Sequence, residues 1–171
     1  GFFPHGKILG SAIAAIDIAL WDIKGKVWDA PVYDLLGGRV RDKVAGYCHL
    51  HGGSEGTEEL VTDAKARVDE GWKFVRWGLS TEDSLLEPTR AVQRTVAQFR
   101  DLREALGEEI ELCFDIHTRL DPPDAIQLCR EVLPYRPFFM EDPIRSESPQ
   151  AFHLLRQKID TPLAVGEQES E

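Results

Sequence analysis

Hydrophobic residues recur at three- and four-residue intervals in the first part of the chain, which is the period of a helix with one apolar face. Ser11 precedes this stretch as a good N-cap, and the pattern ends near Trp28. The apolar positions that follow the period are Ile13, Ile16, Leu20, Ile23 and Val27. The sequence therefore predicts a helix over 11–28 whose apolar stripe packs against another part of the protein.

Farther along, short apolar runs alternate with amphipathic stretches, which is typical of strands and helices in turn. After a short helix from Pro31 to Leu36, ended by Gly37 and Gly38, we expect strands at 44–50, 72–79, 111–117, 138–141 and 163–166. The helices between them are expected at 58–70, 83–106, 123–133 and 149–158, with Pro88 as a break or a first-turn residue. Repeated strand–helix units predict parallel strands covered by helices, in a doubly wound sheet or a TIM-type barrel.

Composition narrows the classes of partner. The 20 basic and 30 acidic residues give a formal charge of −10, which argues against nucleic acids and anionic membranes. It does not argue against an acidic substrate, because a bound cation can reverse the local charge. No apolar run approaches the roughly 20 residues of a membrane span, no signal peptide opens the chain, and the three cysteines lack a C-x-x-C spacing. We therefore expect a cytoplasmic protein without disulfides or a zinc site.

Three predicted strands end in an acidic residue, and the spacing of these residues is equal. Asp115, Glu141 and Glu167 are separated by 26 residues in each case (115 to 141 and 141 to 167), about the length of one strand–helix unit. The spacing predicts that they lie level on adjacent strands, at the carboxyl edge where barrel active sites lie. Because carboxylates held that close repel one another, a cation is expected between them, and oxygen-only ligation suits Mg²⁺ or Mn²⁺.

Each acid alone could equally be a helix N-cap or a solvated loop residue, and only the equal spacing favours a metal site. Asp142 could replace Glu141, because strand alternation turns neighbouring residues to opposite faces. His117 comes two residues after Asp115, so we expect it on the same face. A histidine there could transfer a proton to or from a bound substrate, whereas a lone histidine at a strand end is more often a surface or capping residue.

These residues resemble a known family. The segment SAIAAIDIALWDIKGKVWDAPVYDLLGG is similar to the part of the mandelate racemase subgroup of the enolase superfamily that links the capping domain to the barrel. The segments DIHTRLDPP, PYRPFFMEDPIRSE and TPLAVGEQ resemble the galactonate and mannonate dehydratases. The resemblance implies a partial TIM-type (β/α)7β barrel, with its first five strands in residues 44–171, preceded by the terminal helices of the capping domain in residues 1–43.

The resemblance also implies a chemistry. It assigns Asp115, Glu141 and Glu167 as Mg²⁺ ligands and His117 as the general acid on a departing 3-hydroxyl. It places Arg119 near the substrate, although a salt-bridge role for Arg119 is equally open. The implied reaction is the dehydration of a sugar acid, an aldonate such as galactonate or mannonate, to a 2-keto-3-deoxy acid through an ene-diolate intermediate.

One departure from the wider family concerns the catalytic base, the residue that removes a proton from the substrate. Racemases and muconate-lactonising enzymes keep a K-x-K pair on the second barrel strand, whereas this chain has FVRWGLS there, with Arg76 and Trp77. Lysine-base chemistry is therefore disfavoured. In the dehydratases the base is a histidine of a His-Asp dyad, which would fall after Glu171, or a tyrosine near the second strand. No tyrosine lies between Tyr47 and Tyr135.

The resulting hypothesis is a hydro-lyase of sugar-acid catabolism that acts on a small molecule and forms a homo-oligomer as a full-length protein. Two alternatives stay open: a catalytically inactive superfamily member kept as a subunit, and an acid-sugar epimerase, which would need two opposed bases. His49 and His51 end the first expected strand and are candidate substrate contacts, although a solvated loop explains them equally well.

The chain begins with Gly1 and stops at Glu171 just after a strand, and the resemblance implies that further barrel strands follow. Because a five-stranded part of a barrel has two unpaired edges and an uncovered interior, we expect the chain, purified alone, to show neither a cooperative thermal transition nor dehydration of sugar acids. Calorimetry and a keto-acid assay check this expectation. Full activity from the isolated chain would contradict it.

Overall fold

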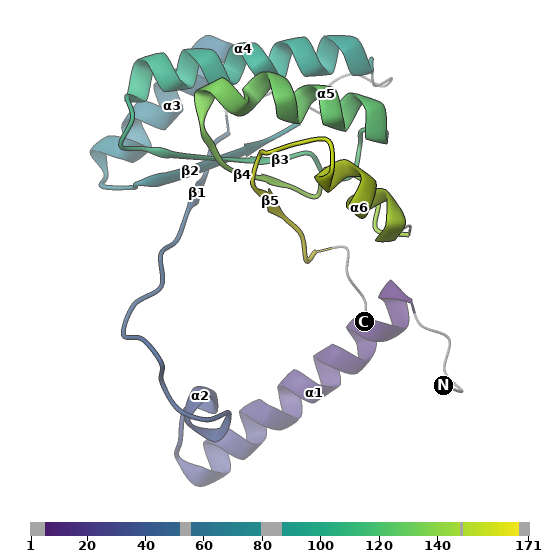
Figure 1. Cartoon of the computed structure of the whole chain (residues 1–171). Helices are drawn as coiled ribbons and strands as arrows, with labels where there is room; N and C mark the ends of the chain where they lie inside the picture. The colour runs from purple at the N-terminus through teal and green to yellow at the C-terminus, as the bar shows by residue number, and fades with distance from the viewer. Residues whose placement is uncertain (1–5, 52–55, 80–86, 148, 168–171) are drawn as a thin grey trace. The chain divides into compact units, whose positions relative to one another are not determined.

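The structure, a computed structural model, describes residues 6–51, 56–79, 87–147 and 149–167. The chain divides into two units, one that ends at Ala45 and one that runs from Gly46 to Glu167 (Figure 1). Among the described residues, no helix combines the length and the apolar character that a membrane crossing requires.

The first unit consists of α1 (Lys7–Trp28) and α2 (Val32–Leu35). Helix α1 begins one turn earlier than predicted, with Gly6 as its N-cap, so the prediction that Ser11 caps it is wrong. The reason is that nothing between Gly6 and Ser11 breaks a helix, and the amide of Gly10 donates to the Gly6 carbonyl at 2.9 Å. Helix α2 forms as predicted, with Pro31 as its N-cap.

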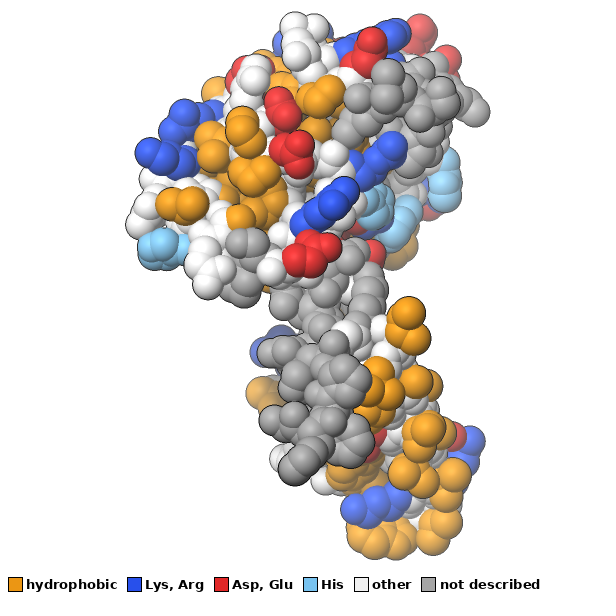
Figure 2. Space-filling model, turned by 90° about the vertical axis from the view of Figure 1, so that its right-hand side faces the viewer, with side chains coloured by type: hydrophobic (Ala, Val, Ile, Leu, Met, Phe, Trp, Pro, Cys, Tyr) orange, Lys and Arg blue, Asp and Glu red, His pale blue; other side chains and the backbone are white. Residues whose placement is uncertain are grey.

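Gly25 gives the turn after α1 and the start of α2 room to approach α1. A Cβ at this position would lie 2.8 Å from the Ala30 carbonyl oxygen and 3.5 Å from Cγ2 of Val32. The predicted apolar stripe of α1 forms, but it remains largely exposed, and Figure 2 shows hydrophobic side chains gathered along this unit. Its exposed members include Ile13, Ile16, Leu20, Ile23 and Val27. That the stripe packs against another part of the protein stays a prediction.

The second unit is a parallel five-stranded sheet with the strand order β1-β2-β3-β4-β5. The strands are β1 (Cys48–His49), β2 (Phe74–Gly78), β3 (Glu111–Asp115), β4 (Pro137–Glu141) and β5 (Leu163–Ala164). The helices between them are α3 (Thr57–Asp69), α4 (Pro88–Leu106), α5 (Pro122–Val132) with the 3-10 turn η1 (Leu133–Tyr135), and α6 (Pro149–Arg156). Figure 1 shows α3, α4 and α5 on one face of the sheet.

The sequential strand order decides between the two folds that the sequence allowed. A doubly wound sheet reverses its strand order at a switch point, whereas a barrel adds each strand beside the previous one. The described strands contain no reversal. The predicted α/β fold of the barrel type, with parallel strands and covering helices, is therefore confirmed.

Four of the strands are shorter than predicted, whereas β4 begins one residue earlier, at Pro137. Strand β1 contains two residues rather than seven, and β3 stops at Asp115 because His117 and Thr118 adopt left-handed backbone angles, with φ of 54° and 57°. Helix α4 begins at Pro88, so the predicted first-turn role of this proline is confirmed. The expected helical residues 83–86 lie outside the described part of the chain.

Alternation along the strands separates an apolar face from a polar one. Val75, Trp77 and Phe114 are buried in the core. The rings of Trp77 and Phe99 lie 4.6 Å apart between centroids, and the indole N–H of Trp77 donates to the buried Gln98 side chain at 3.1 Å. Because successive side chains of a strand alternate, this burial turns Arg76 and Asp115 to the opposite face. The hydrophobic core therefore determines which residues line the other side of the sheet.

At the edge of the sheet where the strands begin, Arg103 of α4 donates to four backbone carbonyls. Its Nε bonds the Tyr135 carbonyl at 3.0 Å and its Nη2 bonds that of Arg136 at 3.1 Å. Its Nη1 bonds the carbonyls of Gly107 at 2.7 Å and Ile110 at 2.8 Å. One guanidinium thus joins the end of α4, the approach to β3 and the turn before β4.

Replacement of Arg103 by alanine in the whole protein is expected to lower the free energy of unfolding by about 2–4 kcal/mol, because partly buried carbonyls lose charged donors. Arg100→Ala is the matched control, since Arg100 lies on the same helix and makes an exposed ion pair with Asp101. Such pairs contribute about 0–1 kcal/mol. Denaturant unfolding checks both values, and equal losses in the two variants would contradict the structural role of Arg103.

Candidate active site

The carboxyl edge of the sheet brings two of the three predicted ligands to one level. The register pairs Gly78 with Asp115 and Asp115 with Glu141, so the prediction that these two carboxylates lie level is confirmed. The same prediction is wrong for Glu167. Glu141 pairs with Ala164, so the level position on β5 comes 23 residues later (141 to 164) rather than 26. Glu167 is exposed and lies beyond the end of β5.

Asp115 is buried, with a side chain 1% exposed, and its carboxylate oxygens have three partners. Its Oδ1 accepts a hydrogen bond from the backbone N–H of His117 at 2.7 Å. Its Oδ2 lies 2.9 Å from Nε2 of the His117 ring and also contacts Nη2 of Arg76. A buried carboxylate requires such compensation, since ionised groups are costly to remove from water.

Arg76 lies on β2 and its guanidinium contacts four side chains. Besides Asp115, its Nε lies 3.4 Å from Oε2 of Glu141, and its Nη1 lies 3.3 Å from Nδ1 of His49. The Tyr47 ring centroid lies 6.0 Å from the guanidinium carbon. Burial lowers the pKa of His49 and the Arg76 charge lowers it further. The neutral His49 ring is therefore favoured, and its Nδ1 can accept a hydrogen bond from Arg76.

The position of the His117 ring depends on a glycine. A Cβ added to Gly78 would lie 3.0 Å from Cε1 and 3.3 Å from Nδ1 of His117, so the missing side chain provides the room for this ring. The prediction that His117 lies beside Asp115 is confirmed, but by a left-handed turn rather than by extended strand geometry. The side chain of His117 is 43% exposed, so one side of the ring faces solvent.

The neighbouring acids Glu141 and Asp142 were expected to face in opposite directions. Glu141 contacts Arg76, whereas Asp142 is buried and has a φ of 39°, and its amide donates to the Ala164 carbonyl at 3.0 Å. Burial raises the pKa of Asp142, and the charges of Asp115, Glu141 and Glu167 raise it further, while His117 opposes them. The three predicted metal ligands thus all raise the pKa of the Asp142 carboxyl group.

The other predicted contacts are Arg119 and His51. Arg119 is half-buried, and its amide donates to the Ile116 carbonyl at 3.2 Å, which closes the turn after β3. The amide of His51 donates to Asp63 at 2.8 Å while its side chain is exposed, as the loop interpretation expects. Within the described ranges, no group of three or more His, Cys, Asp or Glu residues is arranged to hold a metal ion. The ligand assignment therefore stays a prediction.

Sequence reasoning missed the contacts of Arg76, which it treated only as the absence of a lysine pair. A signal was present, because an arginine inside the apolar run FVRWG must have a partner if the strand is buried on both faces. The register neighbour of Arg76 on β3 is Cys113, which lies two residues before Asp115 and on the same face of the strand.

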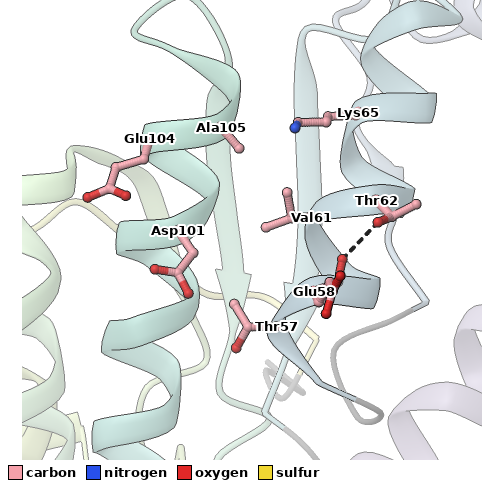
Figure 3. A pocket seen from close by; sticks show the side chains of 8 residues that line it. All are labelled: Thr57, Glu58, Val61, Thr62, Lys65, Asp101, Glu104 and Ala105. Atoms are coloured by element: carbon pink, nitrogen blue, oxygen red, sulfur yellow. Dashed lines mark hydrogen bonds between the residues drawn. The ribbon is translucent and has the colours of Figure 1, made fainter.

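A groove of about 660 Å³ lies between α3 and α4 (Figure 3). Its lining residues are Thr57, Glu58, Val61, Thr62 and Lys65 from α3 and Asp101, Glu104 and Ala105 from α4. The Thr62 hydroxyl donates to the Glu58 carbonyl at 2.9 Å. Because the groove belongs to the helical layer and shares no residue with the cluster around Asp115, it is separate from the candidate active site.

A parallel sheet in sequential order, with acidic side chains and a histidine at its carboxyl edge, defines an α/β protein of the barrel class with a polar site at the strand ends. Residues 59–171 match the family model described as "Enolase C-terminal domain-like". Residues 4–37 match the N-terminal domain of the mandelate racemase / muconate lactonizing enzyme family. The chain belongs to the enolase superfamily.

Curated relatives carry more specific names. A D-galactonate dehydratase of Pectobacterium atrosepticum is 40% identical over 167 residues, which is 98% of this chain and 43% of the relative. A D-galactonate dehydratase family member of Musicola paradisiaca is 35% identical over an alignment of 199 positions, which covers 98% of this chain and 47% of the relative. The chain thus spans about half the length of the curated relatives it matches.

Solved structures of the superfamily have the same fold. An enolase from Pantoea ananatis, solved with bound D-gluconate and Mg, matches with a TM-score of 0.87 and 32% identity over 100% of this chain and 48% of that one. A member of the enolase superfamily from Salmonella Typhimurium matches with a TM-score of 0.86 and 27% identity over 95% of this chain and 47% of that one. The five described strands therefore correspond to part of a larger fold.

The raised pKa of Asp142 predicts a stability effect of known sign. In the metal-free whole protein near pH 7, Asp142→Asn should raise the melting temperature, because the amide removes a buried charge and asparagine tolerates the positive φ. The gain should shrink as the pH falls through the raised pKa and vanish below the ordinary value of 3.8, where the carboxyl is protonated in both the folded and the unfolded state.

Melting curves from about pH 3 to about pH 7.5 with a chelator present measure this difference. Asp160→Asn is the matched control, since Asp160 is exposed. A gain that is constant with pH, or a loss of stability near pH 7, would contradict the assignment of a costly charge to Asp142.

Proposed function

We propose that the whole protein is a metal-dependent hydro-lyase that removes water from a sugar acid and yields a 2-keto-3-deoxy acid. The observation that carries this proposal is the arrangement around Asp115, which lies level with Glu141 and contacts the His117 ring at 2.9 Å. Relatives that carry the name D-galactonate dehydratase, and a related structure with D-gluconate and Mg, support an aldonate as the substrate class.

The positions of Asp115 and Glu141 support a shared divalent cation. Asp115 and Glu141 already share one cationic group, the Arg76 guanidinium, so the two carboxylates can be satisfied from a single position. The charge of Glu167 contributes, with those of Asp115 and Glu141, to the raised pKa of Asp142. We therefore assign Asp115, Glu141 and Glu167 as the residues that would hold Mg²⁺, with Mn²⁺ as a substitute of the same ligand preference. When bound, the ion supplies positive charge to stabilise the substrate carboxylate as the neighbouring proton leaves.

In this proposal His117 is the general acid. Its Nε2 is held by Asp115, and its partly exposed ring is accessible from solvent. The carbon–oxygen bond at position 3 of the substrate breaks, and the hydroxyl leaves as water with the proton that His117 donates. A base outside the described residues removes the proton at position 2. The resulting enol then loses the proton of its 2-hydroxyl and gains one at carbon 3, which gives the 2-keto-3-deoxy acid. Asp115 keeps the ring oriented throughout.

Two further residues complete the proposed site. His49 is held near it through Nη1 of Arg76 and is proposed to bind substrate hydroxyls as a neutral ring. Arg119, in the turn after β3, is proposed to bind the substrate from that side. We also propose that the whole protein is a homo-oligomer with a cytoplasmic location. Residues 1–43 are proposed to end a capping domain, and residues 44–171 to form the first part of the barrel.

The test uses the whole protein and a panel of aldonic and aldaric acids in the presence of Mg²⁺. We expect at least one aldonate to yield a 2-keto-3-deoxy acid. His117→Asn should lower kcat by about 10²–10⁴-fold, the usual contribution of a general acid, while the Mg²⁺ affinity measured by calorimetry stays nearly unchanged. Asp115→Asn should abolish Mg²⁺ binding.

His153→Asn is the matched control, because His153 is an exposed histidine of α6 that bonds Gln157 at 2.9 Å, away from the site. Full turnover by His117→Asn would overturn the role of His117. Mg²⁺ binding without turnover of any acid in the panel would instead indicate an inactive superfamily member.

A further inference from the structure

Arg76 occupies the place between the two level carboxylates. Its side chain is only 10% exposed, and it contacts Asp115 through Nη2 and Glu141 through Nε. These are two of the three residues that the proposed function assigns to the metal ion. The guanidinium therefore provides a positive charge to the same pair of carboxylates that a divalent cation would use.

Three of the roughly four lone-pair positions on the Asp115 carboxylate are occupied, and both positions on Oδ2 are among them. A carboxylate oxygen has about two lone-pair positions. On Oδ2 these are taken by Nη2 of Arg76 and by Nε2 of His117, and Oδ1 accepts from the backbone amide of His117. A cation that binds Asp115 through Oδ2 must displace one of these two side chains. Displacement of Arg76 is favoured, because two positive charges at one carboxylate repel each other.

The remaining contacts of Arg76 do not depend on Asp115. Nη1 faces Nδ1 of His49 at 3.3 Å, and the Tyr47 ring lies 6.0 Å from the guanidinium carbon. These contacts use a different nitrogen and the face of the guanidinium. They can therefore persist when Nη2 loses Asp115, which lowers the cost of the exchange.

We propose that Arg76 is an internal competitor of the divalent cation: it holds Asp115 and Glu141 in the metal-free protein and releases Asp115 when the ion binds. This inference rests on the proposed function, since it requires a metal at these residues. It adds that the metal-free site is kept intact by an arginine, and that metal affinity is reduced by the free energy of displacing it.

Calorimetry on the metal-free whole protein tests the proposal with Mg²⁺ alone. Arg76→Met removes the charge and keeps the apolar stem. It should tighten the Mg²⁺ dissociation constant by about tenfold, because no competitor has to leave. Arg90→Met is the matched control, since Arg90 makes an exposed ion pair with Glu87. The Mg²⁺ affinity of the Arg90→Met variant should equal that of the unmodified protein. Equal or weaker binding by Arg76→Met would overturn the proposal.

Thermal stability gives a second readout. Without metal, Arg76→Met should melt at a lower temperature than the unmodified protein, because Asp115 loses its counter-charge, and Mg²⁺ should restore more stability to the variant. If the variant does not fold, Arg76→Lys serves in its place, because lysine keeps a charge but lacks the planar fork that reaches both carboxylates. Arg76→Lys should bind Mg²⁺ more tightly than the unmodified protein and less tightly than the methionine variant.

A measurement without any substitution completes the test. The arginine side-chain ¹⁵N signals of the unmodified protein should include one that shifts when Mg²⁺ saturates the site and that is absent in Arg76→Lys. A shift confirms the exchange, and an unmoved signal contradicts it. If the unmodified protein dehydrates a sugar acid and binds Mg²⁺ but Arg76 does not respond, this inference alone fails. If it neither binds Mg²⁺ nor dehydrates any acid, the proposed function fails as well.

Discussion

The cost of burying one carboxylate organises the carboxyl edge of the sheet. Asp115 is almost fully removed from solvent, and its charge is compensated from three directions: the backbone of the next turn, the His117 ring and the Arg76 guanidinium. Each of these groups is positioned by a separate feature, namely a left-handed turn, a glycine on the neighbouring strand and the alternation of β2. The chemistry proposed for this edge depends on that compensation.

Much of the fold could be predicted because it depends on local patterns. Proline at a helix start, glycine after a helix and alternation of apolar runs with amphipathic stretches all act within a few residues. They placed α2, the first-turn position of Pro88 in α4 and the order of strands and helices correctly, although α4 was expected to begin at 83. Equal spacing likewise predicted that Asp115 and Glu141 lie level, since one strand–helix unit separates them in both chain and space.

The rest depends on contacts between distant parts of the chain. The connection from β4 to β5 brings Ala164 rather than Glu167 level with Glu141, because the step from Glu141 to its level partner is 23 residues (141 to 164) rather than 26. The left-handed turn at His117 could not be inferred from residue type, since histidine, although enriched at positive φ, adopts other conformations far more often. Arg76 and His49 are 27 positions apart in sequence, and no local pattern relates them.

The hydrogen bonds of Arg103 show how a connection between elements of the fold, here called the Arg103 joint, can tolerate changes of sequence at most of its positions. Its four partners are carbonyl oxygens of the main chain, which every residue type possesses. As far as these bonds are concerned, positions 110, 135 and 136 can exchange their side chains over evolutionary time while the arginine cannot. Homologous chains should therefore vary at the positions whose carbonyls accept these hydrogen bonds. A comparison of many such sequences would show a constant Arg103 and changing residues at positions 110, 135 and 136.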